Sequence, residues 1–325
     1  MLVVVTGAAG FIGSHLCEAL LRQGHDVVGL DNFDAFYSRA EKQRNLAEVL
    51  ATASKLERTF VCHEADICDP TALPPLLQGA DAVVHLAALA GVRPSLERPE
   101  RYVKVNLDGT ANVLQQAHLA GVQRVVFASS SSVYGNNPVV PFAEHHAVDH
   151  PISPYAATKK GGELLCHTWH HLYGMKIACL RFFTVYGPRQ RPDLAMRKFC
   201  QSVMQGREIT LFGDGSTSRD YTYVADTVAG IVAALQWTDS PEPRFDVFNL
   251  GNSHPISLSE LVAAVEKAVG KPAQIRREPM QAGDVERTFA LIDKAAQVLG
   301  YRPATPLDQG LKAMVSWLES YAAPA

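Results

Sequence analysis

Three glycines near the start of the chain constrain its fold more than any other feature. A short apolar run, Leu2–Thr6, leads into the segment GAAGFIG and then into the amphipathic stretch SHLCEALLRQG. The order of strand, glycine turn and helix is typical of the first unit of a doubly wound α/β domain, where glycines allow a tight turn and a close approach of backbone to a pyrophosphate. A tight turn that binds nothing is the alternative. We expect the dinucleotide contacts to come from Gly7, Gly10, Phe11, Ile12 and Gly13.

Apolar runs alternate with amphipathic stretches through the first 180 residues. Their continuous hydrophobicity indicates strands that are buried on both faces, as in a parallel sheet covered by helices. The expected strands are 2–6, 26–31, 59–65, 82–86, 124–129 and 176–182, and the expected helices lie near 12–23, 40–53, 71–78, 99–120 and 155–173. This pattern predicts an α/β fold with a doubly wound parallel sheet (Rossmann) over residues 1–180. A smaller, partly interleaved C-terminal α/β lobe that would bind the substrate is expected over 181–325, with a return strand near 246–250.

Composition restricts the class of protein but not its chemistry. The 325 residues carry 30 Lys+Arg and 33 Asp+Glu, so a net charge of −3 gives no reason to expect a nucleic acid or an anionic membrane as partner. No apolar stretch reaches the roughly 18 residues of a membrane span, and the first residues resemble a strand rather than a signal peptide. The six cysteines form no C-x-x-C pair. We expect reduced thiols and a cytoplasmic location.

The residues after the next strands indicate which dinucleotide binds. Asp31 ends the second expected strand, where a carboxylate can bind both hydroxyls of the adenosine ribose and would repel a 2′-phosphate. No arginine follows it directly, so NAD is favoured over NADP, although Asp31 could instead only cap the strand end. The remaining expected cofactor contacts are Asn32, Asp66 and Ile67 near the adenosine, and Leu86, Ala87, Ala88 and Asn106 further along the chain.

A tyrosine and a lysine four residues apart form the candidate catalytic pair. Tyr155 and Lys159 would lie on one face of a helix, and an ammonium group beside a phenol lowers the phenol's pKa. Tyr155 could then act as a general base towards a hydroxyl group. The serine run Ser129–Ser132 ends the fifth expected strand, at the sheet edge where α/β proteins bind ligands. The alternatives are a surface Tyr/Lys pair and an ordinary strand-to-loop turn, the latter describing Ser129 better than Ser130.

Together, GAAGFIG, HLAA, the serine run before VYG, and YAATK resemble the extended short-chain dehydrogenase/reductase family over essentially the whole chain. The segments DNFDAFY, AGVRPSLERPERYVKVN and RFFTVYGPRQRPDLA are most similar to the NAD-dependent nucleotide-sugar epimerases, in particular the UDP-glucuronate 4-epimerases. This resemblance implies inversion at C4 of a UDP-sugar through a transient 4-keto intermediate. It also implies that Tyr155 is the base, that Ser130 bonds the reacting hydroxyl, and that Lys159 contacts the nicotinamide ribose.

Departures from related sequences favour simple epimerisation of a uronate. Ser131 and Ser132 stand where the resembling dehydratases and decarboxylases carry carboxylates, and Thr184 stands where glucose-type epimerases usually have asparagine. A guanidinium can bind a carboxylate through two parallel hydrogen bonds. We therefore predict that Arg191, with Thr184, Ser131 and Ser132, forms a pocket for the C6 carboxylate, unless Arg191 serves a surface or interface. The other expected substrate contacts, by resemblance, are Arg93, Arg219 and Arg287, while Leu291 replaces an aspartate that relatives often carry.

Several alternatives remain open from the sequence. The chain could be a UDP-glucose 4-epimerase, or a non-catalytic NAD-sensing protein on the same fold. The cluster of Glu144, His145, His146 and His150 lacks the spacing of a structural metal site, and no metal is expected. Members of the resembling family commonly pair through two helices from each copy, here near 99–120 and 155–173, so we expect a homodimer.

Overall fold

A single parallel sheet organises the larger part of the molecule. The computed structural model describes residues 1–279 and 287–322. Its main sheet has seven parallel strands in the order β10-β6-β5-β4-β1-β2-β3. The strands are β1 (Leu2–Thr6), β2 (Asp26–Asp31), β3 (Phe60–Glu64), β4 (Ala82–His85), β5 (Arg124–Ser130), β6 (Lys176–Phe182) and β10 (Phe245–Leu250). The predicted doubly wound α/β class is confirmed.

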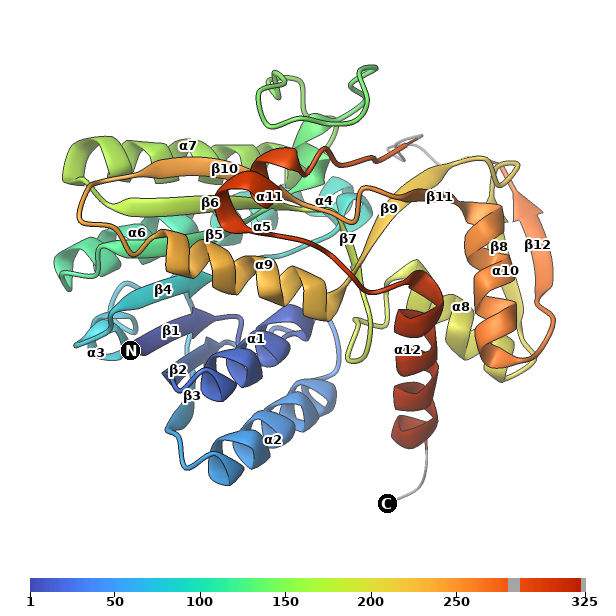
Figure 1. Ribbon diagram of the computed structural model, residues 1–325, viewed down its shortest axis with the longest axis horizontal. Helices are drawn as coiled ribbons and strands as arrows, with labels where there is room; N and C mark the ends of the chain where they lie inside the picture. Colours follow the sequence, from blue (N-terminus) through green and yellow to red (C-terminus); the bar gives the residue numbers. More distant parts are fainter. Residues whose placement is uncertain (280–286, 323–325) are drawn as a thin grey trace.

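Helices cover both faces of this sheet (Figure 1). One face carries α1 (Phe11–Arg22), α2 (Arg39–Lys55), α9 (Val224–Trp237) and α11 (Asp293–Leu299), and the other carries α3 (Pro74–Leu77), α4 (Val92–Glu97), α5 (Pro99–Val103), α6 (Gly109–Leu119) and α7 (Pro154–Tyr173). Val3 and Val5 of β1 belong to the first core, and Val4 belongs to the second. Because side chains of a strand alternate between its faces, two apolar cores require the unbroken apolar run of the sequence.

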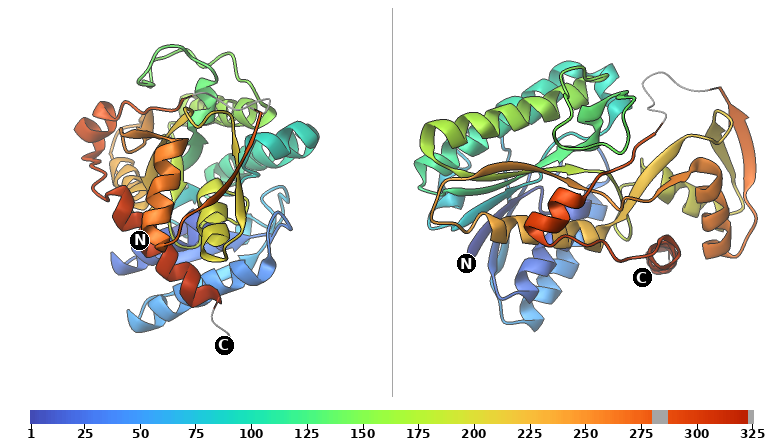
Figure 2. Two further views of the ribbon diagram at one scale, coloured as in Figure 1. Left: turned by 90° about the vertical axis from the view of Figure 1, so that its right-hand side faces the viewer. Right: turned by 45° about the horizontal axis from the view of Figure 1, so that its top comes forward.

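A smaller lobe extends from the carboxyl edge of the main sheet (Figure 2). It contains a three-stranded sheet of β7 (Thr184–Tyr186), β9 (Ser218–Tyr223) and β11 (Pro255–Ser257), and a pair of β8 (Glu208–Phe212) and β12 (Gln274–Glu278). The helices α8 (Ala195–Met204), α10 (Leu258–Val269) and α12 (Leu307–Ala322) enclose a separate apolar core. Since α9 and β10 return to the main sheet, the chain crosses between the lobes more than once. A functional division at residue 180 stays a prediction.

Two expected helices differ from the structure for local reasons. The segment 71–78 forms only the short helix α3, because Asp69 accepts hydrogen bonds from Thr71 in a turn before it and Gly79, at φ +74°, ends it. The segment 99–120 is divided into α5 and α6 by a π-helical turn, Lys104–Asp108. The Asn106 side chain lies in this turn and bonds Leu89 and Thr158. The turn therefore connects the loop after β4 to α7 through hydrogen bonds.

The packing of α7 on β5 generates a test of the fold. A methyl group added at Gly162 would lie 2.3 Å from the Phe127 ring, whereas one added at Gly161 would meet only the tip of Leu107, at 2.6 Å. We expect Gly162→Ala to lower the free energy of unfolding by about 1–3 kcal/mol, because overpacking outweighs the gain in helix propensity. Gly161→Ala is the matched control and should lower the free energy of unfolding clearly less. Urea unfolding of both variants measures this, and equal stabilities would contradict the packing described.

Candidate active site

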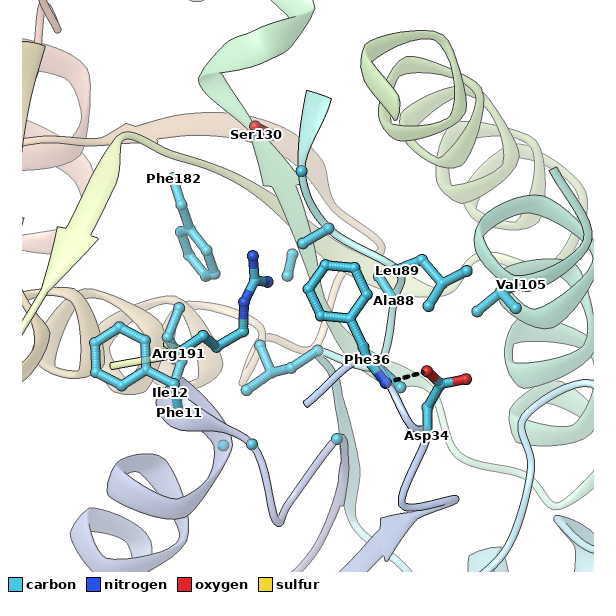
Figure 3. A pocket seen from close by; sticks show the side chains of 18 of the residues that line it. Phe11, Ile12, Asp34, Phe36, Ala88, Leu89, Val105, Ser130, Phe182 and Arg191 are labelled. Carbon is cyan, nitrogen blue, oxygen red and sulfur yellow. Dashed lines mark hydrogen bonds between the residues drawn. The ribbon is translucent and has the colours of Figure 1, made fainter. Parts of the chain in front are cut away.

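A cavity of about 380 Å³ opens at the carboxyl ends of β1, β2, β4, β5 and β6 (Figure 3). Parallel strands end at one edge, so the loops that follow them converge there. Most of the residues expected to bind cofactor or substrate line this cavity. These are Gly7, Gly10, Phe11, Ile12, Gly13, Asp31, Asn32, Ile67, Leu86, Ala87, Ala88, Ser130, Ser131, Ser132, Tyr155, Lys159, Thr184 and Arg191.

The glycine loop has the shape that a pyrophosphate requires. Gly7 has a φ of +74°, and a Cβ atom on Gly13 would lie only 2.1 Å from the carbonyl oxygen of Gly7. Helix α1 begins directly after Gly10 with no side-chain cap and no acidic residue in its first turn. The first N–H groups of the helix, with the positive end of its dipole, therefore face the cavity wall without a competing carboxylate. The residues present fit a bound dinucleotide.

Asp31 is held by a lysine that the sequence reasoning missed. The Asp31 carboxylate accepts hydrogen bonds from the backbone N–H groups of Ala9, at 3.2 Å, and Phe33, at 2.8 Å. The Lys42 ammonium on α2 donates to it at 3.0 Å, and both side chains are buried. Lys42 lines the cavity, eleven residues after Asp31. Nothing in the local sequence separates it from an ordinary helix lysine, because the contact needs α2 to fold back over β2.

Two residues of the expected cofactor set lie behind the cavity wall. Asp66 does not line the cavity and instead accepts hydrogen bonds from Asn32 at 3.0 Å and from the Cys68 backbone at 2.8 Å. Burial opposes ionisation of Asp66, but these bonds outweigh it and lower its pKa. Asn106 is also absent from the lining, since its amide is occupied by Leu89 and Thr158. It positions a loop that does line the cavity.

Tyr155 and Lys159 enter the cavity from α7, and Ser130 enters from the end of β5. The Lys159 ammonium donates to the carbonyl of Ala128 at 2.7 Å, and burial lowers its pKa to about 8. Burial raises the pKa of Tyr155, while a hydrogen bond with Ser130 and the positive charge of Arg191 act in the opposite direction. Arg191 is thus a cation that favours the Tyr155 phenolate, and the same effect of Lys159 stays a prediction.

The serine run divides between two surroundings. Ser129 donates a hydrogen bond of 2.7 Å to Glu163, whose carboxylate forms a buried ion pair with Arg181 at 2.8 Å. Ser130 instead accepts from the backbone of Ser132 at 3.2 Å, and its hydroxyl donates to the Ser132 hydroxyl at 3.1 Å. All four serines line the cavity, but only Ser129 is held by the buried Glu163. The buried pair was not expected from the sequence, because β6 and α7 meet only in the fold.

Arg191 supplies a positive charge in the cavity wall. Its Nε and Nη2 atoms donate to the two carboxylate oxygens of Asp193 at 3.0 and 2.8 Å. The guanidinium lies 5.0 Å from the centre of the Phe36 ring, and Figure 3 shows it between Phe36 and Phe182, directed into the cavity. Its side chain is 17% exposed. A buried, oriented guanidinium of this kind can receive a carboxylate.

The other three arginines assigned to substrate lie outside this cavity. Arg93, on α4, stacks over Phe212 of the smaller lobe at 5.1 Å. The backbone of Arg287 pairs with Ser218, next to Arg219, so Arg219 and Arg287 lie on adjacent backbone segments. These two arginines are therefore close together in the smaller lobe. They are separate from Arg191, which lines the cavity.

The remaining sequence features were also located. Glu144 accepts a hydrogen bond from the backbone of Asn249 at 2.9 Å, and within the described ranges no three His, Cys, Asp or Glu side chains group as they would around a metal ion. All six cysteines are free thiols. Among the helices in the described part of the chain, none has the length and apolar character to span a membrane.

Comparisons with known proteins agree on one family. The model of the NAD dependent epimerase/dehydratase family matches residues 3–251. A UDP-glucuronate 4-epimerase from Thermodesulfobacterium geofontis is 41% identical over 97% of this chain and 95% of its own length.

Solved structures of the same kind also match. The UDP-glucuronic acid 4-epimerase of Bacillus cereus, in complex with UDP-glucuronic acid and NAD, has a TM-score of 0.90 and 37% identity over 99% of this chain and all of its own. A UDP-glucose 4-epimerase from Thermotoga maritima has a TM-score of 0.88 and 30% identity over 99% and 100% of the two chains. The chain belongs to the NAD dependent epimerase/dehydratase family.

Proposed function

We propose that this protein uses NAD to invert C4 of a UDP-sugar, and that its substrate pair is UDP-glucuronate and UDP-galacturonate. The observation that carries the proposal is the presence of Arg191 in one cavity with Tyr155 and Ser130. A hexose offers no negative charge at C6, so of the two sugars only a uronate could add a second ionic partner to the guanidinium that Asp193 already holds. The family and the names of the relatives support the reaction, and the cavity supports the choice of sugar.

The proposed reaction assigns a separate task to each residue in the cavity. The glycine loop and Asp31 would hold NAD⁺, which supplies a reversible hydride acceptor at C4. Tyr155 would remove the proton of the C4 hydroxyl and later return a proton, with Ser130 hydrogen-bonded to the same oxygen. Lys159 would contact the nicotinamide ribose. No net oxidation follows, because the hydride returns to the opposite face of C4 after the sugar turns.

Recognition of the uronate would use the face of Arg191 that Asp193 leaves open. Asp193 occupies Nε and Nη2, so Nη1 stays available to a carboxylate. Ser131, Ser132 and Thr184 line the same cavity and can donate hydroxyl hydrogen bonds. Arg93, Arg219 and Arg287 stay proposed contacts of the UDP group, since they lie towards the smaller lobe.

We also propose a cytoplasmic homodimer. Helices α5 to α7 expose Val103, Leu119, Leu164 and Leu172, which are between 45% and 66% exposed. Exposed apolar side chains on neighbouring helices mark a contact surface between proteins. The six free thiols fit a reducing compartment.

Product analysis tests the proposed reaction. Purified protein incubated with UDP-glucuronate, without added reductant, should form UDP-galacturonate, and UDP-glucose should be turned over far more slowly. Tyr155→Phe should retain bound NAD but lose about 10²–10⁴-fold of the rate, because the general base is removed. Chromatography of the products and measurement of bound NAD test these expectations. Turnover of UDP-glucose alone would overturn the uronate assignment, and NAD binding without any turnover would favour a sensor.

The charge of Arg191 should be visible in both specificity and pH dependence. We expect Arg191→Gln to reduce kcat/KM for UDP-glucuronate by about 10- to 100-fold through loss of a charged hydrogen bond. The positive charge lowers the pKa of Tyr155, so its removal raises that pKa, and the rising limb of the kcat/KM profile should move to higher pH. Arg276→Gln, on exposed β12, is the control for net charge. An unshifted limb would contradict the electrostatic role.

Association of the chains has its own test. A double Leu164→Glu/Leu172→Glu variant should run as a monomer in sedimentation, because charge would replace two apolar side chains of the proposed interface. Val298→Glu, which changes a 46% exposed side chain on α11, should not alter the mass. A wild-type monomer, or a dimer that survives the double substitution, would contradict this interface.

A further inference from the structure

The segment that carries Arg191 is anchored to the cofactor-binding half of the molecule. This segment, residues 187–194, connects β7 to α8 and is called the arginine loop below. Several of its contacts are with α1, which begins at the end of the glycine loop, and with α2. The imidazole Nε2 of His15, on α1, lies 3.0 Å from the carbonyl oxygen of Pro188. One helix thus borders the cofactor site at its N-terminus and contacts the substrate-side loop one turn later.

Arg189 makes the strongest of these contacts. Its Nη2 atom donates to Glu18 of α1 at 2.7 Å and also bonds Glu48 of α2. The Arg189 side chain is only 5% exposed, and its backbone has a φ of +63°. A non-glycine residue in the left-handed region is uncommon and persists where its surroundings hold it. The ion pair therefore holds an unfavourable backbone conformation two residues before Arg191.

A second arginine, Arg197, also contacts the arginine loop. Arg197, on α8, donates to Glu41 of α2 at 2.8 and 3.0 Å, and also to the carbonyl of Gln190 at 2.6 Å. The Gln190 amide in turn donates to Val185 at 2.9 Å. The residue before Arg191 is thus fixed from two directions. Little freedom remains for the backbone that presents the Arg191 guanidinium.

We propose that Arg189 is a positioning residue for uronate recognition: its buried pair with Glu18 sets the place of Arg191 relative to the cofactor. The inference deepens the proposed function and rests on it. A buried ion pair contributes little to stability compared with an apolar pair, but it fixes geometry through its directional bonds. A guanidinium that is displaced by about 1 Å from the group it binds contributes much less to the rate. Helix α1 would in this way align the cofactor and the sugar carboxylate together.

A double-mutant cycle separates positioning from simple support of the fold. The first change is the paired variant Glu18→Gln/Arg189→Gln, which removes both charges and leaves no lone buried carboxylate. The second change is Arg191→Ala. In the wild-type background we expect the paired variant to lower kcat/KM for UDP-glucuronate at least tenfold, mainly through KM. In the Arg191→Ala background the same paired variant should change kcat/KM less than twofold, because the guanidinium that the pair positions is no longer present.

Arg44→Gln is the matched control. Arg44 also joins the two parts of the chain, by stacking 4.3 Å from the Tyr321 ring on α12, but it does not touch the arginine loop. It should leave kcat/KM unchanged. Equal losses from the paired variant in both backgrounds, or equal losses from Arg44→Gln, would overturn the positioning role and assign the pair to stability alone.

The cycle is also measured on the Kd of UDP-glucuronate by calorimetry, so that the two proposals fail separately. If the wild type binds UDP-glucuronate without turning it over, the proposed function is wrong, and the coupling in Kd still decides the role of Arg189. If the wild type does not bind UDP-glucuronate, both are wrong. Bound NAD should be the same in all variants, and its loss from the paired variant would contradict the assignment to uronate recognition.

Discussion

The common carboxyl edge of the parallel strands is the constraint on which the rest of the structure depends. It delivers the glycine loop from β1, Asp31 from β2 and Ser130 from β5 to one cavity, while α7 adds Tyr155 from above the sheet. None of these groups is near another in the sequence. Their chemistry depends on the register of strands buried in two apolar cores, because the sheet sets the positions from which they enter the cavity.

Electrostatics then determines what the cavity can do. Burial holds Tyr155 in its neutral form, and the nearby Ser130 and Arg191 favour the phenolate. Burial also lowers the pKa of Lys159 to about 8. The same guanidinium that suits a uronate carboxylate therefore also assists the proposed base. In the proposed function, recognition of the substrate and activation of Tyr155 would be linked through this one residue.

Local sequence predicted the main sheet well and the contacts between distant elements poorly. The bounds of β1, β2 and β6 agree with the expected strands because each is a continuous apolar run. The strands β7 and β11 have only three residues each, and the fully buried residues of β9 are the polar Asp220 and Thr222, so apolar periodicity does not identify these strands. Lys42 and Arg189 likewise depend on helices that fold back over the sheet. Arg191 was found because its motif resembles a known family, while its neighbour Asp193 was not considered.

The most direct test of the account follows the hydrogen at C4. UDP-glucuronate carrying deuterium at C4 is converted by the purified protein in ordinary water, and the product is examined by NMR and mass spectrometry. We expect UDP-galacturonate to keep the deuterium at C4, because the hydride would leave and return within one cavity while only the hydroxyl proton exchanges through Tyr155. Replacement of the label by solvent hydrogen would contradict inversion by internal hydride return.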